Sequence, residues 1–110
     1  MPDGALIGRV GLFAIDWSRR EGELGILIGR DHWGKGYGRE VARTMLRYGF
    51  DTLNLNRIYL RVNADNERGI KAYEAAGFER EGVLRSHMFV EGKYIDMVMM
   101  GVLRDEWRRE

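Results

Sequence analysis

The sequence predicts an α/β (α+β) fold in which two α-helices pack against a mixed β-sheet. Three observations predict this class: paired apolar segments of strand length lie at both ends of the chain, two segments with helical spacing lie between them, and a further strand-like segment separates those two. Helices that alternate with strands in this way are typical of a sheet covered by helices. The length of 110 residues is that of one domain, so we expect a single domain over residues 1–110.

The first two strands are expected over residues 6–15 and 23–29. Residues 6–15 (LIGRVGLFAI) are apolar and partly alternating, and residues 23–29 (ELGILIG) are apolar on both faces. The polar residues 18–22 between them are typical of a hairpin loop.

Two helices are expected around a third strand. Residues 37–50 have helical spacing, and residues 57–62 (RIYLRV) alternate as a strand does. Residues 67–76 form a second, shorter helix, which Gly77 ends as a C-cap glycine. The apolar face of the first helix comprises Val41, Ala42, Met45, Leu46 and Phe50.

The last two strands are expected over residues 78–90 and 94–103, joined by a short turn that contains Gly92. The residues after them are polar apart from Trp107. We expect the aromatic and methionine side chains of this region in the core rather than in a ligand site, namely Met88, Phe89, Met97, Met99 and Met100.

Composition excludes several kinds of chemistry. The absence of cysteine excludes disulfides, thiol nucleophiles and cysteine-based zinc sites. Two histidines and two serines make a Ser-His-Asp triad or a dedicated metal site improbable, so we expect no metal. The net charge is +1 with interleaved signs, which predicts neither a nucleic-acid nor a membrane partner. Without a long apolar run or a signal-peptide pattern, a cytoplasmic location is expected.

A glycine-rich segment precedes the first helix. Its alternate glycines, Gly34, Gly36 and Gly38, remove the Cβ atoms and let backbone N–H groups converge beside a helix N-terminus, which suits a pyrophosphate. A flexible loop is the alternative. A P-loop fits poorly because Lys35 is followed by glycine, and a dinucleotide fingerprint fits poorly because the spacing is G-x-G-x-G and the next strand carries arginines.

Together with residues 66–78 (NERGIKAYEAAGF), this loop resembles the GNAT superfamily of acetyl-CoA-dependent N-acetyltransferases. Residues 50–78, 81–85 and 92–97 resemble the branch that holds ribosomal-protein N-terminal and spermidine acetyltransferases. The resemblance covers nearly the whole chain and implies a mostly antiparallel sheet. It also implies acetyl-CoA (CoA) as co-substrate and direct transfer of acetyl to a primary amine of a peptide, polyamine or small molecule.

Two departures from the family pattern are visible. Trp33 replaces the usual first residue of the loop. Because family members contact the cofactor there mostly through backbone groups, we expect the replacement to have little effect. Family members normally have a strand, one or two helices and another strand before the segment that starts at Asp3, and that region forms one wall of the acceptor cleft. We therefore expect an N-terminally truncated form of the fold.

The resemblance implies two catalytic residues. Tyr73 is the candidate acid, since a phenol with a pKa near ~10 is protonated at neutral pH; from spacing alone it is a core aromatic. Glu23 is the candidate base, with a solvent-facing strand charge as the alternative and His32 as another base. The resemblance also implies that Asn66 and Arg68 contact the cofactor. The simpler alternatives are that Asn66 only caps the helix and that Arg68 is only an exposed helix arginine. The implied cofactor-binding residues are Ile26, Leu27, Ile28, Trp33, Gly34, Lys35, Gly36, Tyr37, Gly38, Arg39, Asn66, Arg68 and Tyr73.

Two alternatives to an active enzyme stay open at this point. One is a module that binds CoA or acyl-CoA without full catalytic activity. The other is a fragment completed by a second copy, which makes a homodimer possible.

Overall fold

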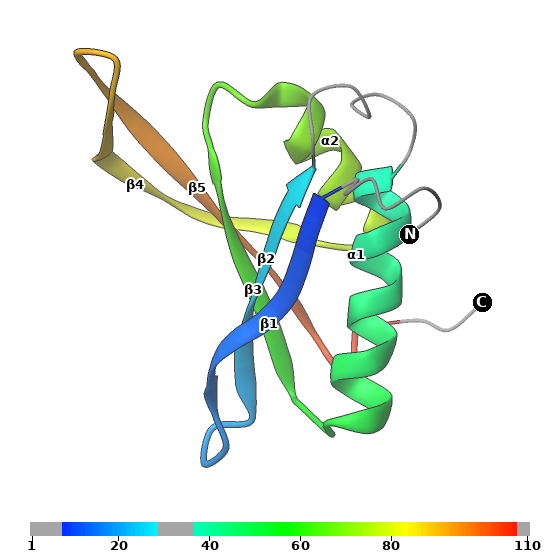
Figure 1. The fold of residues 1–110 in the computed structure, drawn as a ribbon. Helices are drawn as coiled ribbons and strands as arrows, with labels where there is room; N and C mark the ends of the chain where they lie inside the picture. Colours follow the sequence, from blue (N-terminus) through cyan, green and yellow to red (C-terminus); the bar gives the residue numbers. More distant parts are fainter. Residues whose placement is uncertain (1–7, 29–36, 108–110) are drawn as a thin grey trace.

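The computed structural model describes residues 8–28 and 37–107. Its elements follow the predicted order and form one mixed sheet with two α-helices (Figure 1). The glycine-rich segment over residues 29–36 lies outside the described part of the chain. The elements are β1 (Gly8–Asp16), β2 (Glu21–Ile28), α1 (Tyr37–Arg47), the π-helical segment η3 (Tyr48–Thr52), β3 (Arg57–Asn63), α2 (Glu67–Ala76), β4 (Glu79–Val90) and β5 (Lys93–Leu103).

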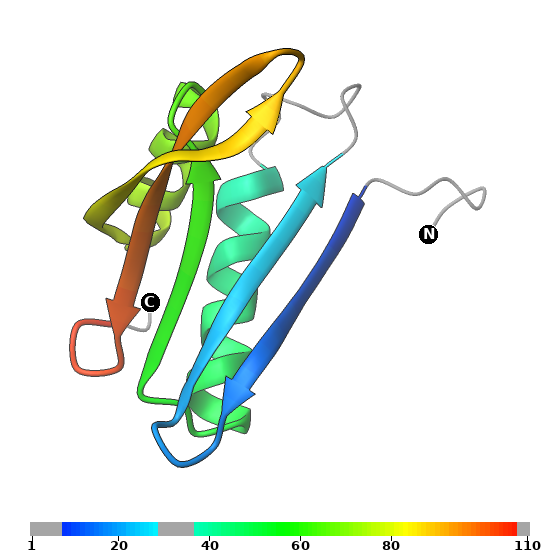
Figure 2. The same cartoon turned by 90° about the vertical axis from the view of Figure 1, so that its left-hand side faces the viewer.

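The sheet has the strand order β1-β2-β3-β5-β4. Among the described strands, three of the four pairs are antiparallel, and the pair of β2 and β3 is parallel. Figure 2 shows α1 and α2 behind the sheet, on the same face. The predicted α/β class and the mostly antiparallel sheet are therefore confirmed.

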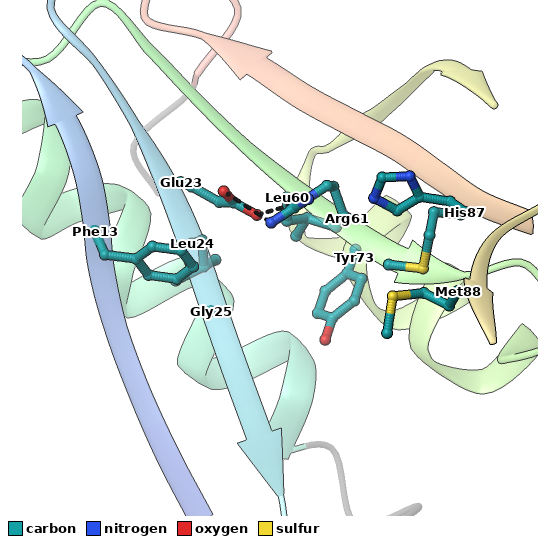
Figure 3. Close-up of a pocket in the computed structure, with 10 residues that line it drawn as sticks. Phe13, Glu23, Leu24, Gly25, Leu60, Arg61, Tyr73, His87 and Met88 are labelled. Carbon is teal, nitrogen blue, oxygen red and sulfur yellow. Dashed lines mark hydrogen bonds and ion pairs between the residues drawn. The ribbon is translucent and has the colours of Figure 1, made fainter. Parts of the chain in front are cut away.

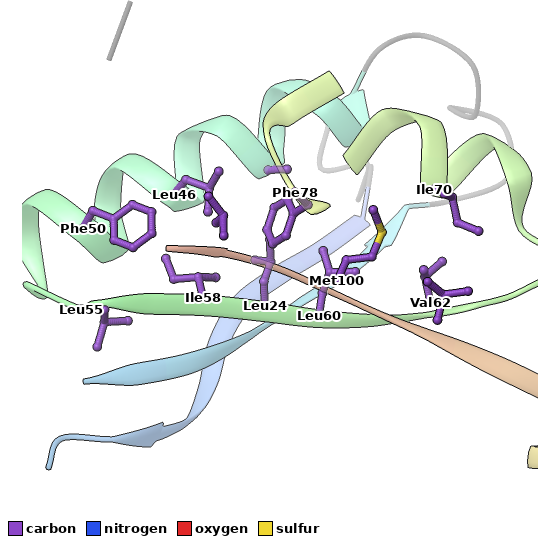
Figure 4. Close-up of a cluster of buried hydrophobic side chains, with 13 residues drawn as sticks. Leu24, Leu46, Phe50, Leu55, Ile58, Leu60, Val62, Ile70, Phe78 and Met100 are labelled. Atoms are coloured by element: carbon purple, nitrogen blue, oxygen red, sulfur yellow. The ribbon is translucent and has the colours of Figure 1, made fainter. Parts of the chain in front are cut away.

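The hydrophobic core lies between that face and the helices (Figure 4). Strand β3 shows how the sequence builds it: Ile58, Leu60 and Val62 are buried, while the residues between them face the other side of the sheet. Burial of such aliphatic side chains is the main force that holds the helices to the sheet. The buried apolar residues are Leu24, Ala42, Leu46, Phe50, Leu55, Ile58, Leu60, Val62, Ile70, Phe78, Val98, Met100 and Val102.

Strands β2 and β3 are joined over a short distance only. Their parallel register runs from Glu21 opposite Arg57 to Glu23 opposite Tyr59. Beyond Glu23 the two strands diverge, and the gap between them widens toward their C-terminal ends (Figure 2). Within the described residues, the part of β2 that follows Glu23 is paired with β1 but has no register with β3.

The first helix differs from the prediction at its end. It was expected to continue to Phe50, but α1 ends at Arg47 and a π-helical turn follows, marked by the Leu53 N–H that donates to the Tyr48 carbonyl at 3.1 Å. Gly49 in this turn is buried, and a Cβ there would lie 2.5 Å from Ile58 Cδ1. The close approach of the backbone to the sheet is therefore possible because residue 49 is glycine.

The prediction of a buried methionine-rich end is wrong for Met88 and Phe89, and Met97 and Met99 are only half-buried. Met100 is fully buried, but Phe89 has an exposed fraction of 63% and Met88 one of 42%. The reason is the position of β4, which is an edge strand of the sheet, and the outer half of the β4–β5 hairpin projects beyond the helices (Figure 1). No helix of the described residues is long and apolar enough to cross a membrane.

Candidate active site

A cavity of about 270 Å³ opens where β2 and β3 separate (Figure 3). Strands β1, β2 and β3, helix α2 and the β4–β5 hairpin all contribute side chains to it, so segments far apart in the sequence meet there. The lining residues are Phe13, Glu23, Leu24, Gly25, Leu60, Arg61, Tyr73, His87, Met88 and Met97.

Glu23 is the last residue of β2 that pairs with β3, and it is buried at the edge of this cavity. Its carboxylate is held by Arg61 of β3: Arg61 Nε donates to Glu23 Oε2 at 2.8 Å, and Arg61 Nη2 donates to Oε1 at 3.4 Å. The interpretation of Glu23 as a strand charge facing solvent is therefore wrong. Each carboxylate oxygen can accept more than one hydrogen bond, so the pair leaves Glu23 able to bind a further donor.

Tyr73 reaches the same cavity from α2, on the other side of the sheet from Glu23. Its ring packs edge-on against Phe78 at a centroid distance of 6.2 Å and against the hydrophobic core. In Figure 3 the hydroxyl points away from the Glu23–Arg61 ion pair, toward the C-terminal end of β2. Burial raises the pKa of the Tyr73 phenol, so this side chain stays protonated at neutral pH. Core packing and access to the cavity are both present.

A bulge in β4 brings His87 to the cavity. The register jumps from Leu84 opposite Met97 to Met88 opposite Ile95, and Ser86 within the bulge has a φ of 49°. The Asp96 carboxylate holds the bulge by accepting the Ser86 N–H at 2.8 Å. A bulge re-aims the side chains of its strand, which explains how an edge strand lines a site here.

Sequence reasoning missed Arg61 as a site residue. It counted this arginine only as evidence against a nucleotide fingerprint, although the alternation of β3 already places it on the side of the sheet away from the core. The available signal was the register: two residues after Tyr59, which lies opposite Glu23, the next side chain on that face is Arg61. Tyr59 itself lies on this face, and burial, followed by the charges of Glu23 and Glu21, raises the pKa of its phenol.

The N-terminus of α2 has the predicted cap. Asn66 Oδ1 accepts the N–H of Gly69 at 3.0 Å, as the side chain of an N-cap residue does. Gly77 ends the helix at a φ of 116°, in the left-handed conformation predicted for it. Arg68 and Arg39 are exposed, and neither lines the cavity.

Several residues that are predicted to contact the cofactor lie outside the described residues. Trp33, Gly34, Lys35 and Gly36 lie there, as does His32. The backbones of Ile26, Leu27 and Ile28 form the diverging end of β2, and Tyr37 and Gly38 begin α1. Among the described residues, no group of three or more histidine, aspartate or glutamate side chains gathers in a way that could hold a metal ion. The expected absence of a metal stays a prediction.

Residues 1–79 match the family described as "Acetyltransferase (GNAT) domain". The chain belongs to the GNAT acetyltransferase family. The predicted resemblance is confirmed, including the branch to which it was assigned, because relatives with both expected activities in their names match along nearly the whole chain.

Two of these GNAT relatives and one solved structure give the extent of the match. The spermidine N(1)-acetyltransferase of Vibrio cholerae is 38% identical over 93% of the chain, and the putative ribosomal N-acetyltransferase YdaF of Bacillus subtilis is 33% identical over 98% of it. The crystal structure of the V. cholerae enzyme in complex with CoA and spermine superposes with a TM-score of 0.86 at 38% identity, over 93% of this chain and 60% of that one. The chain spans 59% of the length of both relatives.

Proposed function

We propose that this chain carries the transfer site of an acetyl-CoA-dependent N-acetyltransferase that moves an acetyl group directly onto a primary amine. The observation that carries the proposal is the placement of a buried carboxylate, Glu23, and a protonated phenol, Tyr73, around one cavity at the divergence of β2 and β3. These are the two kinds of group that amide formation from a thioester needs. Membership in the GNAT family supports the same reaction.

The diverging strands supply the place for the co-substrate. Beyond Glu23, β2 has no register with β3 among the described residues, so its edge offers backbone N–H and C=O groups to a ligand. The pantetheine arm of acetyl-CoA carries amide groups that can pair with such an edge as a strand does. Residues 26–28 are therefore proposed to bind this arm through their backbones, and residues 33–39 to bind the pyrophosphate.

The proposed roles of the two side chains follow from their chemistry. Glu23 accepts a proton from the ammonium group, and the freed nitrogen forms a bond to the thioester carbonyl carbon while the carbon–sulfur bond breaks. Tyr73 donates its phenolic proton to the departing sulfur. The nitrogen loses two protons overall: one replaces the proton of Tyr73, and the other leaves through Glu23 to solvent. The products are the N-acetylated amine and the CoA thiol.

The acceptor is proposed as a primary amine, and the names of the relatives make spermidine the first one to test. A peptide N-terminus and a small monoamine are the other candidates. The test incubates the chain with acetyl-CoA and each amine and follows the release of free thiol. Release above the rate without amine supports the transferase. A CoA-dependent rise in Tm without thiol release on any amine contradicts it and favours a CoA-binding module.

We also propose that the chain forms a homodimer and is cytoplasmic. Support for a second copy comes from the β4–β5 hairpin, where several large apolar side chains are exposed: Val83, Leu84, Met88, Phe89 and Tyr94. Such a surface is more common at an interface than on a free monomer. Sedimentation velocity at two concentrations tests this, and a single monomeric boundary at both contradicts it.

A further inference from the structure

Resting on the proposed function, we propose that Arg61 is a specificity-determining residue. By neutralising Glu23 at the mouth of the cavity, it lowers the preference of the site for amines that carry additional positive charges. The proposal concerns the relative use of acceptors and adds to the roles assigned to Glu23 and Tyr73.

The cavity is lined by one negative and one positive side chain. Among the ten described residues that line it, Glu23 is the only carboxylate and Arg61 the only guanidinium or ammonium group. The other polar lining side chains are Tyr73 and His87. The carboxylate and the guanidinium are joined by two hydrogen bonds of 2.8 and 3.4 Å, so the two charges largely cancel for a group outside the pair.

The positive charge of the pair is more exposed to solvent than the negative charge. The Glu23 side chain has an exposed fraction of 9%, whereas that of Arg61 is 39%. An approaching acceptor therefore meets the guanidinium before it meets the carboxylate. One ammonium group can still bind Glu23 through its remaining acceptor positions. The further ammonium groups of a polyamine extend past the pair and meet the positive charge of Arg61.

A specificity role of Arg61 and a purely structural role affect the acceptors differently. If Arg61 only holds Glu23 in place, its removal impairs every acceptor by the same factor, because each needs the same carboxylate. If Arg61 also repels extra positive charge, its removal favours polyamines over monoamines. The ratio of kcat/KM for the two acceptors cancels the shared loss and reports the repulsion alone.

The chain offers a matched control on the same strand. Arg57 lies on the same face of β3 as Arg61 and also forms an ion pair, in its case with Glu81 of β4. It does not line the cavity. Its replacement removes the same formal charge from the protein, and with it the same long-range effect, without changing a residue that lines the cavity.

The experiment measures kcat/KM for n-butylamine and spermidine with the full chain and with Arg61→Gln, Arg61→Lys and Arg57→Gln. We expect Arg61→Gln to raise the ratio of spermidine to butylamine about tenfold, as removal of one unit charge near a partly solvated site does. Arg61→Lys and Arg57→Gln keep the ratio within about twofold of the wild type. An unchanged ratio in Arg61→Gln overturns the proposal.

Failure of the proposed function is visible separately. If the unsubstituted chain releases no thiol with any amine, the transferase proposal fails. The role of Arg61 is then tested by calorimetric titration of the same variants with spermidine and butylamine. The ratio of the two Kd values is then expected to shift about tenfold in Arg61→Gln and to stay constant in Arg57→Gln. Equal shifts in both variants, or none in either, reject the role of Arg61.

Discussion

Tyr73 carries the most direct residue-scale prediction. Its phenol is protonated at neutral pH and lines the cavity, so its loss removes the proposed proton donor, while the ring contact with Phe78 can be retained. We expect Tyr73→Phe to lower kcat about 100-fold, the usual contribution of general acid catalysis. The Kd for CoA, measured by calorimetry, is expected to change less than about twofold. An unchanged kcat removes Tyr73 as the acid.

The same residue predicts a pH dependence. Because burial raises the pKa of the Tyr73 phenol, the folded chain keeps this proton to a higher pH than the unfolded chain. The resulting contribution to the free energy of unfolding is present below pH ~10 and is lost as the pH rises further. We expect the phenolate absorbance difference between the unsubstituted chain and Tyr73→Phe to have its midpoint above pH ~10. A midpoint below that of free tyrosine contradicts the assigned environment.

Gly49 gives a third residue-scale prediction, about packing. A Cβ at this position would lie 2.5 Å from Ile58 Cδ1 and 3.2 Å from Leu12 Cδ1, and Ile58 is fully buried. We expect Gly49→Ala to lower the free energy of unfolding by about 2 kcal/mol. The additional substitution Ile58→Val removes the clashing methyl group, so the double variant is expected to be about 1 kcal/mol more stable than additivity predicts. Urea unfolding of the four proteins checks this, and strict additivity excludes the clash.

At the scale of the elements, helix α2 depends on its N-cap residue. Asn66 accepts the Gly69 N–H at 3.0 Å and so satisfies one of the amides that every helix start leaves open. We expect Asn66→Ala to cost about 1 kcal/mol, which for a domain near this size lowers Tm by roughly 4–8 °C. Asn66→Asp keeps an acceptor oxygen and serves as the control, with little change expected in thermal unfolding. Equal losses in both variants mean that the side chain acts through something other than the cap.

Most elements could be predicted from the sequence because their signals are local. The alternation in β3, the spacing in α1 and the glycine that ends α2 each act within a few residues. The exceptions arise where distant contacts decide. The π-helical turn at Gly49 follows from packing against Ile58 of another element, and the exposure of Phe89 follows from the edge position of β4.

The site shows the same division at the scale of the whole molecule. The resemblance implied Glu23 as a base and Tyr73 as an acid, and the fold brings both side chains to one cavity. The partner of Glu23 lies 38 residues away on a strand parallel to its own, and no local pattern pairs them. The register between β2 and β3 supplies that information, since it sets both the ion pair and the point of divergence.

Because the register between β2 and β3 is short, a ligand bound between the diverging strands is expected to stabilise the sheet. Three residue pairs join β2 to β3, so a ligand that binds along the diverging edge of β2 adds contacts that the free chain lacks. Stabilisation by such a ligand is about 2.7 kcal/mol at a concentration of 100 Kd, which corresponds to a rise in Tm of roughly 10–20 °C. We expect CoA to produce this rise and to slow hydrogen exchange most at the amides of residues 24–28. Protection confined to β4 and β5 would place the ligand elsewhere and reject the diverging strands as its site.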